Sequence, residues 1–303
     1  MKRALTLAAA SAGIGLAYAA GYEVNAFTLR RRTVPVLPAG HRPLRVLHLS
    51  DLHLTPWQRT KQDWLASLQG LHPDLVVSTG DLIAHRDSVP VLSTALGGLL
   101  DVPGVFVRGS NDYFAPELKN PGRYLLPDDG RRSVHGARLP TAELDDLLIT
   151  AGWLDLDNAR LSLTLGETVV EVVGTDDAHL GYDCYDDVSG PREAGTDLLL
   201  GVTHAPYLRV LDAMAADGAD LVLAGHTHGG QLCLPGGRAL VTNCDLDTGR
   251  ARGLSTHPAG SREPDATWLH VCGGLGTSPT APVRFACRPE ASVLTLVERP
   301  ARH

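Results

Sequence analysis

The sequence predicts an α/β domain in which helices cover a parallel β-sheet. Short apolar runs that suit buried strands alternate with segments that have helical apolar spacing. The first three of these runs are followed by Asp51, Asp81 and Asn111, which are 30 residues apart in turn. A βαβ unit has about 30 residues, so this spacing returns each polar side chain to the same edge of the sheet.

Size and composition fit a folded domain. The chain has 303 residues, 44% of them hydrophobic and 20% charged, so it can bury a sizeable core and disorder throughout is excluded. The net charge is −7 and the pI is near 6.0, and the sequence has no long Lys/Arg run of the kind that contacts the phosphates of nucleic acids. We therefore expect no binding to nucleic-acid duplexes.

The N-terminus carries a membrane-type segment at residues 1–22. Lys2 and Arg3 precede the uncharged residues 4–22, which are just long enough to span a bilayer core of about 20 residues. We expect a signal anchor and a membrane-associated protein. Cleavage near Ala17-Tyr18-Ala19, giving a secreted protein, and a helix packed on the domain are the alternatives.

A linker is expected at residues 23–43, because residues 33–43 contain three prolines and a glycine. The globular domain is then expected at residues 44–303. Its first half has strands at 44–49, 74–78 and 104–107, and helices at 60–70 and 88–100. The second half has strands at 168–173, 197–202 and 220–223, and a helix at 206–217. Further short strands are expected at 160–165, 231–234, 268–272, 283–287 and 292–297.

The five cysteines are odd in number and lack C-x-x-C spacing. This pattern argues against a disulfide framework and a four-cysteine zinc site, while a single bridge such as Cys233–Cys244 stays open.

Seven potential metal ligands lie at the carboxyl ends of expected strands, where α/β sheets bind ligands. They are Asp51, His53, Asp81, Asn111, His204, His226 and His228. Mixed oxygen and nitrogen donors suit Mn, Fe or Zn better than Mg or Ca. A pair of metal ions about 3.5–4 Å apart needs roughly this many ligands, one of them a bridging carboxylate. The set therefore predicts two divalent metal ions.

Four sequence motifs surround these ligands: Ser50-Asp51-Leu52-His53-Leu54, Gly80-Asp81, Thr203-His204 and Gly225-His226-Thr227-His228-Gly229-Gly230-Gln231. Together they resemble the calcineurin-like metallophosphoesterases, and most of all their bacterial branch with an N-terminal membrane segment. The resemblance covers residues 44–296. It implies a four-layer α/β/β/α sandwich of two mixed β-sheets, with a dinuclear metal site at the strand ends.

The resemblance also implies how the ligands divide between the metals. Asp51, His53, Asp81 and His228 would hold one ion. Asp81 would bridge to the second ion, which is completed by an amide near residues 110–111, His204 and His226.

The sequence departs from the family at that amide. The family reads Gly-Asn-His followed by Asp or Glu, whereas this chain reads Gly109-Ser110-Asn111-Asp112. We assign the metal contact to Asn111, because an amide carbonyl is a stronger donor than a neutral hydroxyl, with Ser110 as the alternative. In either case the histidine that would protonate the leaving group is absent.

Residues near these motifs receive minor roles. The glycine-rich residues 273–276 are expected to form a loop at the mouth of the site, because glycine permits close backbone approach. We expect Asp176 and Asp177 in a solvated turn, and His85, His135 and His179 in solvated loops.

The resulting hypothesis is a metal-dependent phosphoric ester hydrolase. Attack by a metal-bound hydroxide would cleave a phosphodiester, phosphomonoester or pyrophosphate, with Asp51, Asp81, Asn111, His204 and His226 in the catalytic set. The N-terminal segment suggests a membrane-related substrate. A soluble nucleotide phosphodiesterase and a non-catalytic metal-binding scaffold are the alternatives.

Overall fold

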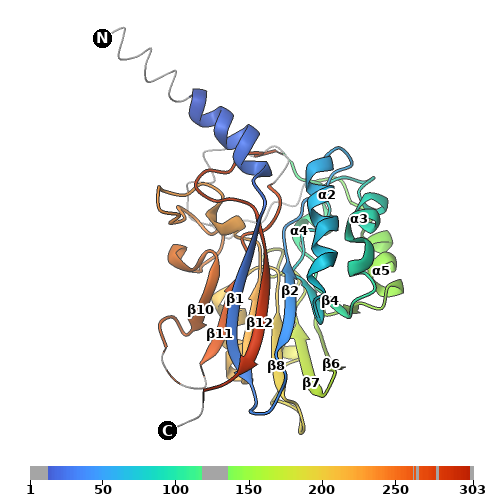
Figure 1. Ribbon diagram of the computed structural model, residues 1–303, viewed down its shortest axis with the longest axis vertical. Helices are drawn as coiled ribbons and strands as arrows, with labels where there is room; N and C mark the ends of the chain where they lie inside the picture. The colour runs from blue at the N-terminus through green and yellow to red at the C-terminus, as the bar shows by residue number, and fades with distance from the viewer. Residues whose placement is uncertain (1–12, 118–135, 262, 264–265, 278–279, 301–303) are drawn as a thin grey trace.

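Two six-stranded sheets pack face to face in the computed structural model, which describes residues 13–117, 136–261, 263, 266–277 and 280–300 (Figure 1). The first sheet has the order β1 (Thr28–Leu37), β12 (Glu290–Glu298), β2 (Leu44–Leu49), β3 (Leu75–Ser78), β4 (Gly104–Phe106) and β5 (Leu154–Asp155). The second has the order β10 (Gly253–His257), β11 (Thr267–Val271), β9 (Leu221–Ala224), β8 (Leu198–Val202), β7 (Thr168–Gly174) and β6 (Ala159–Leu165).

Both sheets are mixed. Strands β2 to β5 are parallel, as are β7, β8, β9 and β11, whereas β12 is antiparallel to β2, and β6 and β10 are antiparallel to their neighbours. Parallel neighbours bring their carboxyl ends to one edge, as the 30-residue spacing predicted.

Helices cover the outer face of each sheet. The first sheet carries α2 (Arg59–Ser67), α3 (Val89–Leu96) and α5 (Thr141–Thr150), and the second carries α6 (Leu208–Ala216). A four-residue helix, α4 (Ser110–Tyr113), follows β4. Short π and 3₁₀ turns complete the helical elements: Tyr18–Tyr22, Glu23–Asn25, Leu68–Leu71, Gly97–Leu99, Tyr185–Asp187, His228–Gly230 and Thr248–Arg250.

Strand alternation explains the layers. On β2, Leu47 and Leu49 face the helices, whereas Leu44 and Val46 face the second sheet. Separate apolar clusters therefore fill the two helix–sheet layers and the layer between the sheets. The α/β/β/α sandwich predicted from the sequence is confirmed.

The expected linker at residues 23–43 is wrong for residues 28–37, because Thr28–Leu37 form β1 and pair in parallel with β12. Val34, Val36 and Leu37 are buried between the sheets. The prolines misled the prediction: β1 is an edge strand, where Pro35 is tolerated. The folded domain therefore begins before residue 44.

Several other expectations differ in detail. Residues 231–234 and 283–287 form no strands and share only an isolated bridge between Leu232 and Phe285. The strand β10 and the helix α5 were not expected. All five cysteines are free, and Cys233 packs in a small cluster with Cys287 rather than bonding to Cys244.

The predicted membrane segment is described only in part, since residues 4–12 lie outside the described residues. Residues 13–17 are helical and continue into the turn at Tyr18–Tyr22. None of the helices in the described parts of the chain is both long enough and apolar enough to cross a membrane.

Candidate metal centre

Six of the seven predicted ligands follow directly after parallel strands. Asp51 and His53 follow β2, Asp81 follows β3, His204 follows β8, and His226 and His228 follow β9. All six are at most 8% exposed. The structure therefore brings residues from both sheets to one buried place.

Four of these side chains form one compact group. One ligand atom from each of Asp51, His53, Asp81 and His228 lies within 4.8 Å of the others. His53 Nε2 is 3.3 Å from both His228 Nε2 and Asp81 Oδ2, and His228 Nε2 is 3.6 Å from Asp51 Oδ1. These oxygen and nitrogen atoms could hold a divalent cation.

A second group adjoins the first through Asp81. His204 Nε2 lies 3.7 Å from Asp81 Oδ2, and His226 Nδ1 lies 3.3 Å from His204 Nε2. Asp81 thus contacts both groups, which is the position a bridging carboxylate requires.

Backbone carbonyls on the far side of three imidazoles determine which ring nitrogen faces the site. His204 Nδ1 lies 2.6 Å from Thr79 O, and His228 Nδ1 lies 3.2 Å from Gly276 O. His226 has the opposite arrangement, with Nε2 3.2 Å from Asn243 O. A carbonyl only accepts, so each of these nitrogens donates its N–H and the other nitrogen is directed into the site.

The backbone at the strand ends is strained. Positive φ angles occur at Asp51 (48°), His53 (40°), Asp81 (55°), His226 (68°) and His228 (50°). Residues other than glycine adopt this region at a cost of order 1–3 kcal/mol each, and such strain clusters at functional sites. The fold thus accepts strain to direct these side chains inward.

Asp112 holds the loop that carries Asp81, a role that the sequence did not predict. Its buried carboxylate accepts hydrogen bonds from the backbone N–H groups of Asp81 (2.7 Å), Leu82 (2.8 Å), Ile83 (3.2 Å) and Gly109 (3.0 Å). Asp112 is therefore a positioning residue behind the site.

Asn111 reaches the site through its backbone. Its N–H donates to Asp81 Oδ1 over 2.7 Å, while its side-chain Nδ2 donates to Ser110 Oγ over 3.1 Å. The predicted metal contact of the Asn111 side chain stays a prediction, as does the Ser110 alternative.

The glycine-rich loop at residues 273–276 closes against the site as predicted. A Cβ atom on Gly274 would lie 2.6 Å from Asp51 Cβ. The Gly276 N–H donates to Asp51 O over 2.6 Å. The fully buried Arg284 holds this loop, donating to the carbonyls of Gly273, Gly274 and Gly276 and also to that of His228.

Burial and neighbouring charge give the four imidazoles different pKa values. Burial lowers the pKa of His53 and His226 well below the ordinary value and that of His228 to about 4. Burial also opposes protonation of His204, but the Asp81, Asp177 and Asp51 carboxylates outweigh it and raise its pKa to about 9.

Two further residues border the site against expectation. Asp177 is fully buried, with Oδ2 unpaired among the described residues, and burial raises its pKa to about 6. The His179 ring lies against that of His226, with centroids 4.6 Å apart. The expectation of a solvated turn and loop is therefore wrong for these two residues. His85 is partly exposed near Asp87, and His135 lies outside the described residues.

Comparisons with known proteins agree with this site. The sequence profile of the family described as calcineurin-like phosphoesterase matches residues 44–230. An uncharacterized metallophosphoesterase of Bacillus subtilis, YkuE, is 26% identical over 97% of this chain and 93% of its own length. A Bos taurus transmembrane protein with a metallophosphoesterase domain is 30% identical over 66% of this chain and 44% of its own length.

A solved structure of a dimetal phosphatase from Danio rerio is also similar, with a TM-score of 0.41, 11% identity, and coverage of 83% of this chain and 98% of that protein. The family profile spans more than half of the sequence and includes all seven predicted ligands. The chain belongs to the calcineurin-like phosphoesterase family.

Proposed function

We propose that this protein hydrolyses phosphoesters with two divalent metal ions, held by ligand groups that share Asp81. The carrying observation is the position of the Asp81 carboxylate, within 4 Å of both His53 Nε2 and His204 Nε2. Asp51, His53, Asp81 and His228 would hold one ion, and Asp81, Asn111, His204 and His226 the other. When bound, the two ions supply Lewis-acid stabilisation of charge on the phosphoryl oxygens.

The donor chemistry supports Mn, Fe or Zn as the metals, because nitrogen donors outnumber carboxylates. The bond cleaved would be a phosphodiester, a phosphomonoester or a pyrophosphate. A non-catalytic scaffold is the alternative function, and turnover distinguishes it from an enzyme.

We further propose that His179 protonates the leaving group in place of the absent family histidine. Asp112 is unsuited to this role, because four backbone N–H groups engage its carboxylate. His179 lies beside His226, and its Nδ1 is 3.1 Å from the Tyr207 hydroxyl. If that hydroxyl donates to Nδ1, the proton resides on Nε2, where an acid can deliver it.

We also propose that the protein works at a membrane and that its substrate is membrane-related. Eight of the twelve large apolar side chains exposed in the described residues come from the N-terminal helical segment and from two loops, a set here called the apolar rim. The rim consists of Ile14, Leu16, Tyr18, Tyr22, Leu232, Leu234, Leu240 and Phe285. Exposed apolar surface of this kind is typical of protein or membrane contacts.

Contacts join the N-terminal helical segment to both loops, and Arg284 of one loop also contacts the backbone of His228 in the metal centre. Tyr18 packs edge-on against Phe285, which bridges to Leu232, and Arg284 N–H donates to Ala19 O. The segment with the three leucines begins four residues after His228. Figure 1 shows the N-terminal helix projecting from one end of the sandwich. The name of the Bos taurus relative, a transmembrane protein, is consistent with this proposal.

The bridging role predicts the effect of Asp81→Asn. Activity on a chromogenic aryl phosphodiester with Mn²⁺ should fall by more than the roughly 100-fold typical of changes around a metal shell. Metal analysis should show one ion or fewer per chain. The exposed Asp87→Asn is the control and should keep both ions. Two full equivalents in Asp81→Asn would refute the bridge, and wild-type protein that binds metals without turnover would favour the scaffold.

The raised pKa of His204 predicts proton release on metal binding. Near pH 7.5 the metal-free side chain carries a proton on Nε2, which a metal must displace, so affinity should rise with pH up to about 9. Calorimetry in buffers of different ionisation enthalpy should detect about one proton released. His204→Asn should abolish the release. His228→Asn should weaken metal binding but leave the proton release unchanged, because His228 is already neutral at this pH.

The acid role predicts a selective defect in His179→Asn. Alkyl esters need a protonated leaving group and should lose about 10²–10⁴-fold in rate, whereas aryl esters should lose little. Rates across a leaving-group series, with metal content checked, provide the measurement. His85→Asn is the matched control. An equal loss for aryl and alkyl substrates would remove His179 from this role.

The membrane proposal predicts where the full-length protein fractionates. It should sediment with membranes, and Ile14→Glu combined with Leu16→Glu should move most of it to the soluble fraction, since a charge in the bilayer costs about 2.5–3.5 kcal/mol. Ile149→Glu, an exposed site on α5, should leave the distribution unchanged. Recovery of a mature chain starting near Ala20 would instead show cleavage.

A further inference from the structure

The layer between the two sheets changes from apolar to polar toward the metal centre. On β1, Val34 and Val36 face this layer, and strand alternation places Arg30 and Arg32 on the same face. The β12 residue paired with Arg30 is Ser292, which also pairs with His48 of β2.

From the opposite sheet, His270 reaches His48, with the two Nδ1 atoms 2.9 Å apart. Both rings and Ser292 are at most 1% exposed. A buried polar layer thus reaches the edge of the sandwich. Figure 1 shows β1 and β12 of the first sheet on the same side of the molecule as β10 and β11 of the second.

A cavity of about 200 Å³ lies at this edge. Its lining consists of Arg30, Arg32, Arg252, Gly253, His270, Glu290 and Ser292. None of these residues belongs to the proposed metal ligands. The Arg30–Arg32 run, the longest basic run in the sequence, thus contributes two side chains to a cavity that the proposed reaction does not use.

The side chains around the cavity carry a net excess of two positive charges. Arg30 Nε is 2.9 Å from Glu290 Oε2, so this pair is neutral overall. Arg32 and Arg252 remain, and neither forms an ion pair with a described residue. Burial lowers the pKa of His270 to about 3, so its ring adds no charge at neutral pH.

Ser292 supplies a second, independent indication of a ligand. Its Oγ is buried and has no hydrogen-bond partner among the residues that the structure describes. An unpaired buried hydroxyl destabilises a fold, so a native protein retains one where something else satisfies it. Here that hydroxyl lines a cavity with two guanidinium groups that face no described carboxylate: Arg32 donates to Arg31 O and Arg252 to Cys287 Sγ.

We propose that this cavity binds a phosphate-like dianion, contacted by Arg32, Arg252 and Ser292. Guanidinium groups match phosphate oxygens in geometry and charge, and a hydroxyl donates to the same oxygens. Inorganic phosphate and the terminal phosphate of a small ester both have this chemistry.

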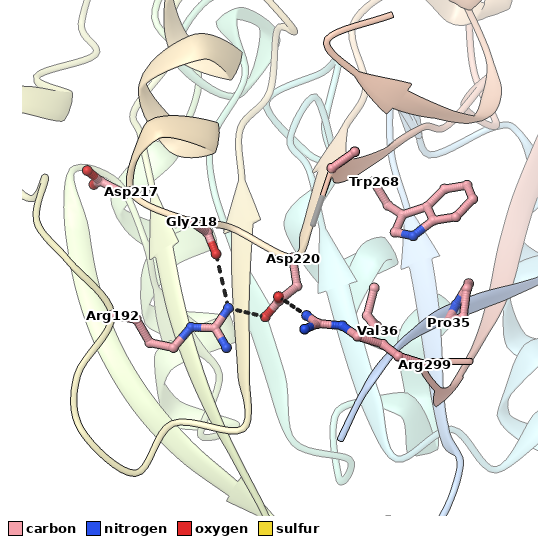
Figure 2. Close-up of a pocket in the computed structure, with 9 residues that line it drawn as sticks. Pro35, Val36, Arg192, Asp217, Gly218, Asp220, Trp268 and Arg299 are labelled. Atoms are coloured by element: carbon pink, nitrogen blue, oxygen red, sulfur yellow. Dashed lines mark hydrogen bonds and ion pairs between the residues drawn. The ribbon is translucent and has the colours of Figure 1, made fainter. Parts of the chain in front are cut away.

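A second cavity provides a contrast. It measures about 320 Å³ and lies at the amino ends of β8 and β9, where Arg192 and Arg299 also meet (Figure 2). There both guanidinium groups bind the Asp220 carboxylate, and Arg192 also donates to Gly218 O. These arginines are engaged within the protein, so that cavity does not call for an anion.

The test is titration of the full chain with inorganic phosphate after complete removal of metals by a chelator, because a loaded metal centre would also take phosphate. Calorimetry should show one saturable site. Arg32→Gln and Ser292→Ala should each weaken binding, the arginine change by about tenfold. Arg31→Gln is the matched control, since it removes the same charge from the neighbouring residue on the other face of β1.

Retention of affinity in Arg31→Gln with loss in both other variants supports the site. Ser292→Ala changes no charge, so its loss separates a directed contact from general attraction. Repeating the titration with glycerol phosphate distinguishes free phosphate from a phosphate ester as the ligand. The site is assigned to whichever of the two binds more tightly. Absence of binding to the metal-free wild type, or equal weakening by Arg31→Gln, would overturn the proposal.

This outcome is distinguishable from failure of the proposed function. Turnover by the metal-loaded variants should equal that of the wild type at low phosphate. A metal-free protein that binds phosphate, together with a loaded protein that cleaves no phosphoester, would retain this site and remove the enzymatic proposal.

Discussion

Three backbone carbonyls, those of Thr79, Asn243 and Gly276, hold the rings of His204, His226 and His228 from behind the metal centre. Each accepts an N–H from one ring nitrogen, so the opposite nitrogen must face the site. The carbonyls come from three loops far apart in the sequence. The chemistry of the centre therefore depends on how accurately the fold places these loops.

Two buried charged side chains hold these loops in place. They do so through hydrogen bonds to backbone N–H and carbonyl groups rather than through ion pairs. Asp112 collects N–H groups from the loop after β3, and Arg284 collects carbonyls from residues 273–276 and from His228. Hydrogen bonds to charged groups contribute about 1.5–3 kcal/mol each, more than neutral ones. Such ties can offset the cost of the positive φ angles at the strand ends.

Much of the sandwich and most of the candidate site could be predicted from the sequence, because strand ends and a 30-residue repeat are local patterns. The rest depends on tertiary contacts. Pro35 in β1 and the two prolines that follow the strand indicate a linker, unless one knows that β12 offers an edge to pair with. Asp177 and His179 resemble a surface turn in sequence, and only the packing of β7 beside β8 brings that turn to His204 and His226. Asp112 matches the acidic position of the family motif, but its role could not be predicted, because its partners are main-chain groups.

The pairing of β1 with β12 has a consequence for synthesis on the ribosome. Thr28 lies opposite Glu290, so β1 cannot pair with its neighbour until β12, the last described strand, has been synthesised. The antiparallel pairing of β12 with β2 cannot form before that point either. Until then β2 has only β3 beside it. Strand β1 is unpaired, so Val34 and Val36 cannot pack into the layer between the sheets. Closing contacts of such sequence separation is slow, so the nascent chain exposes an unfinished edge through most of translation.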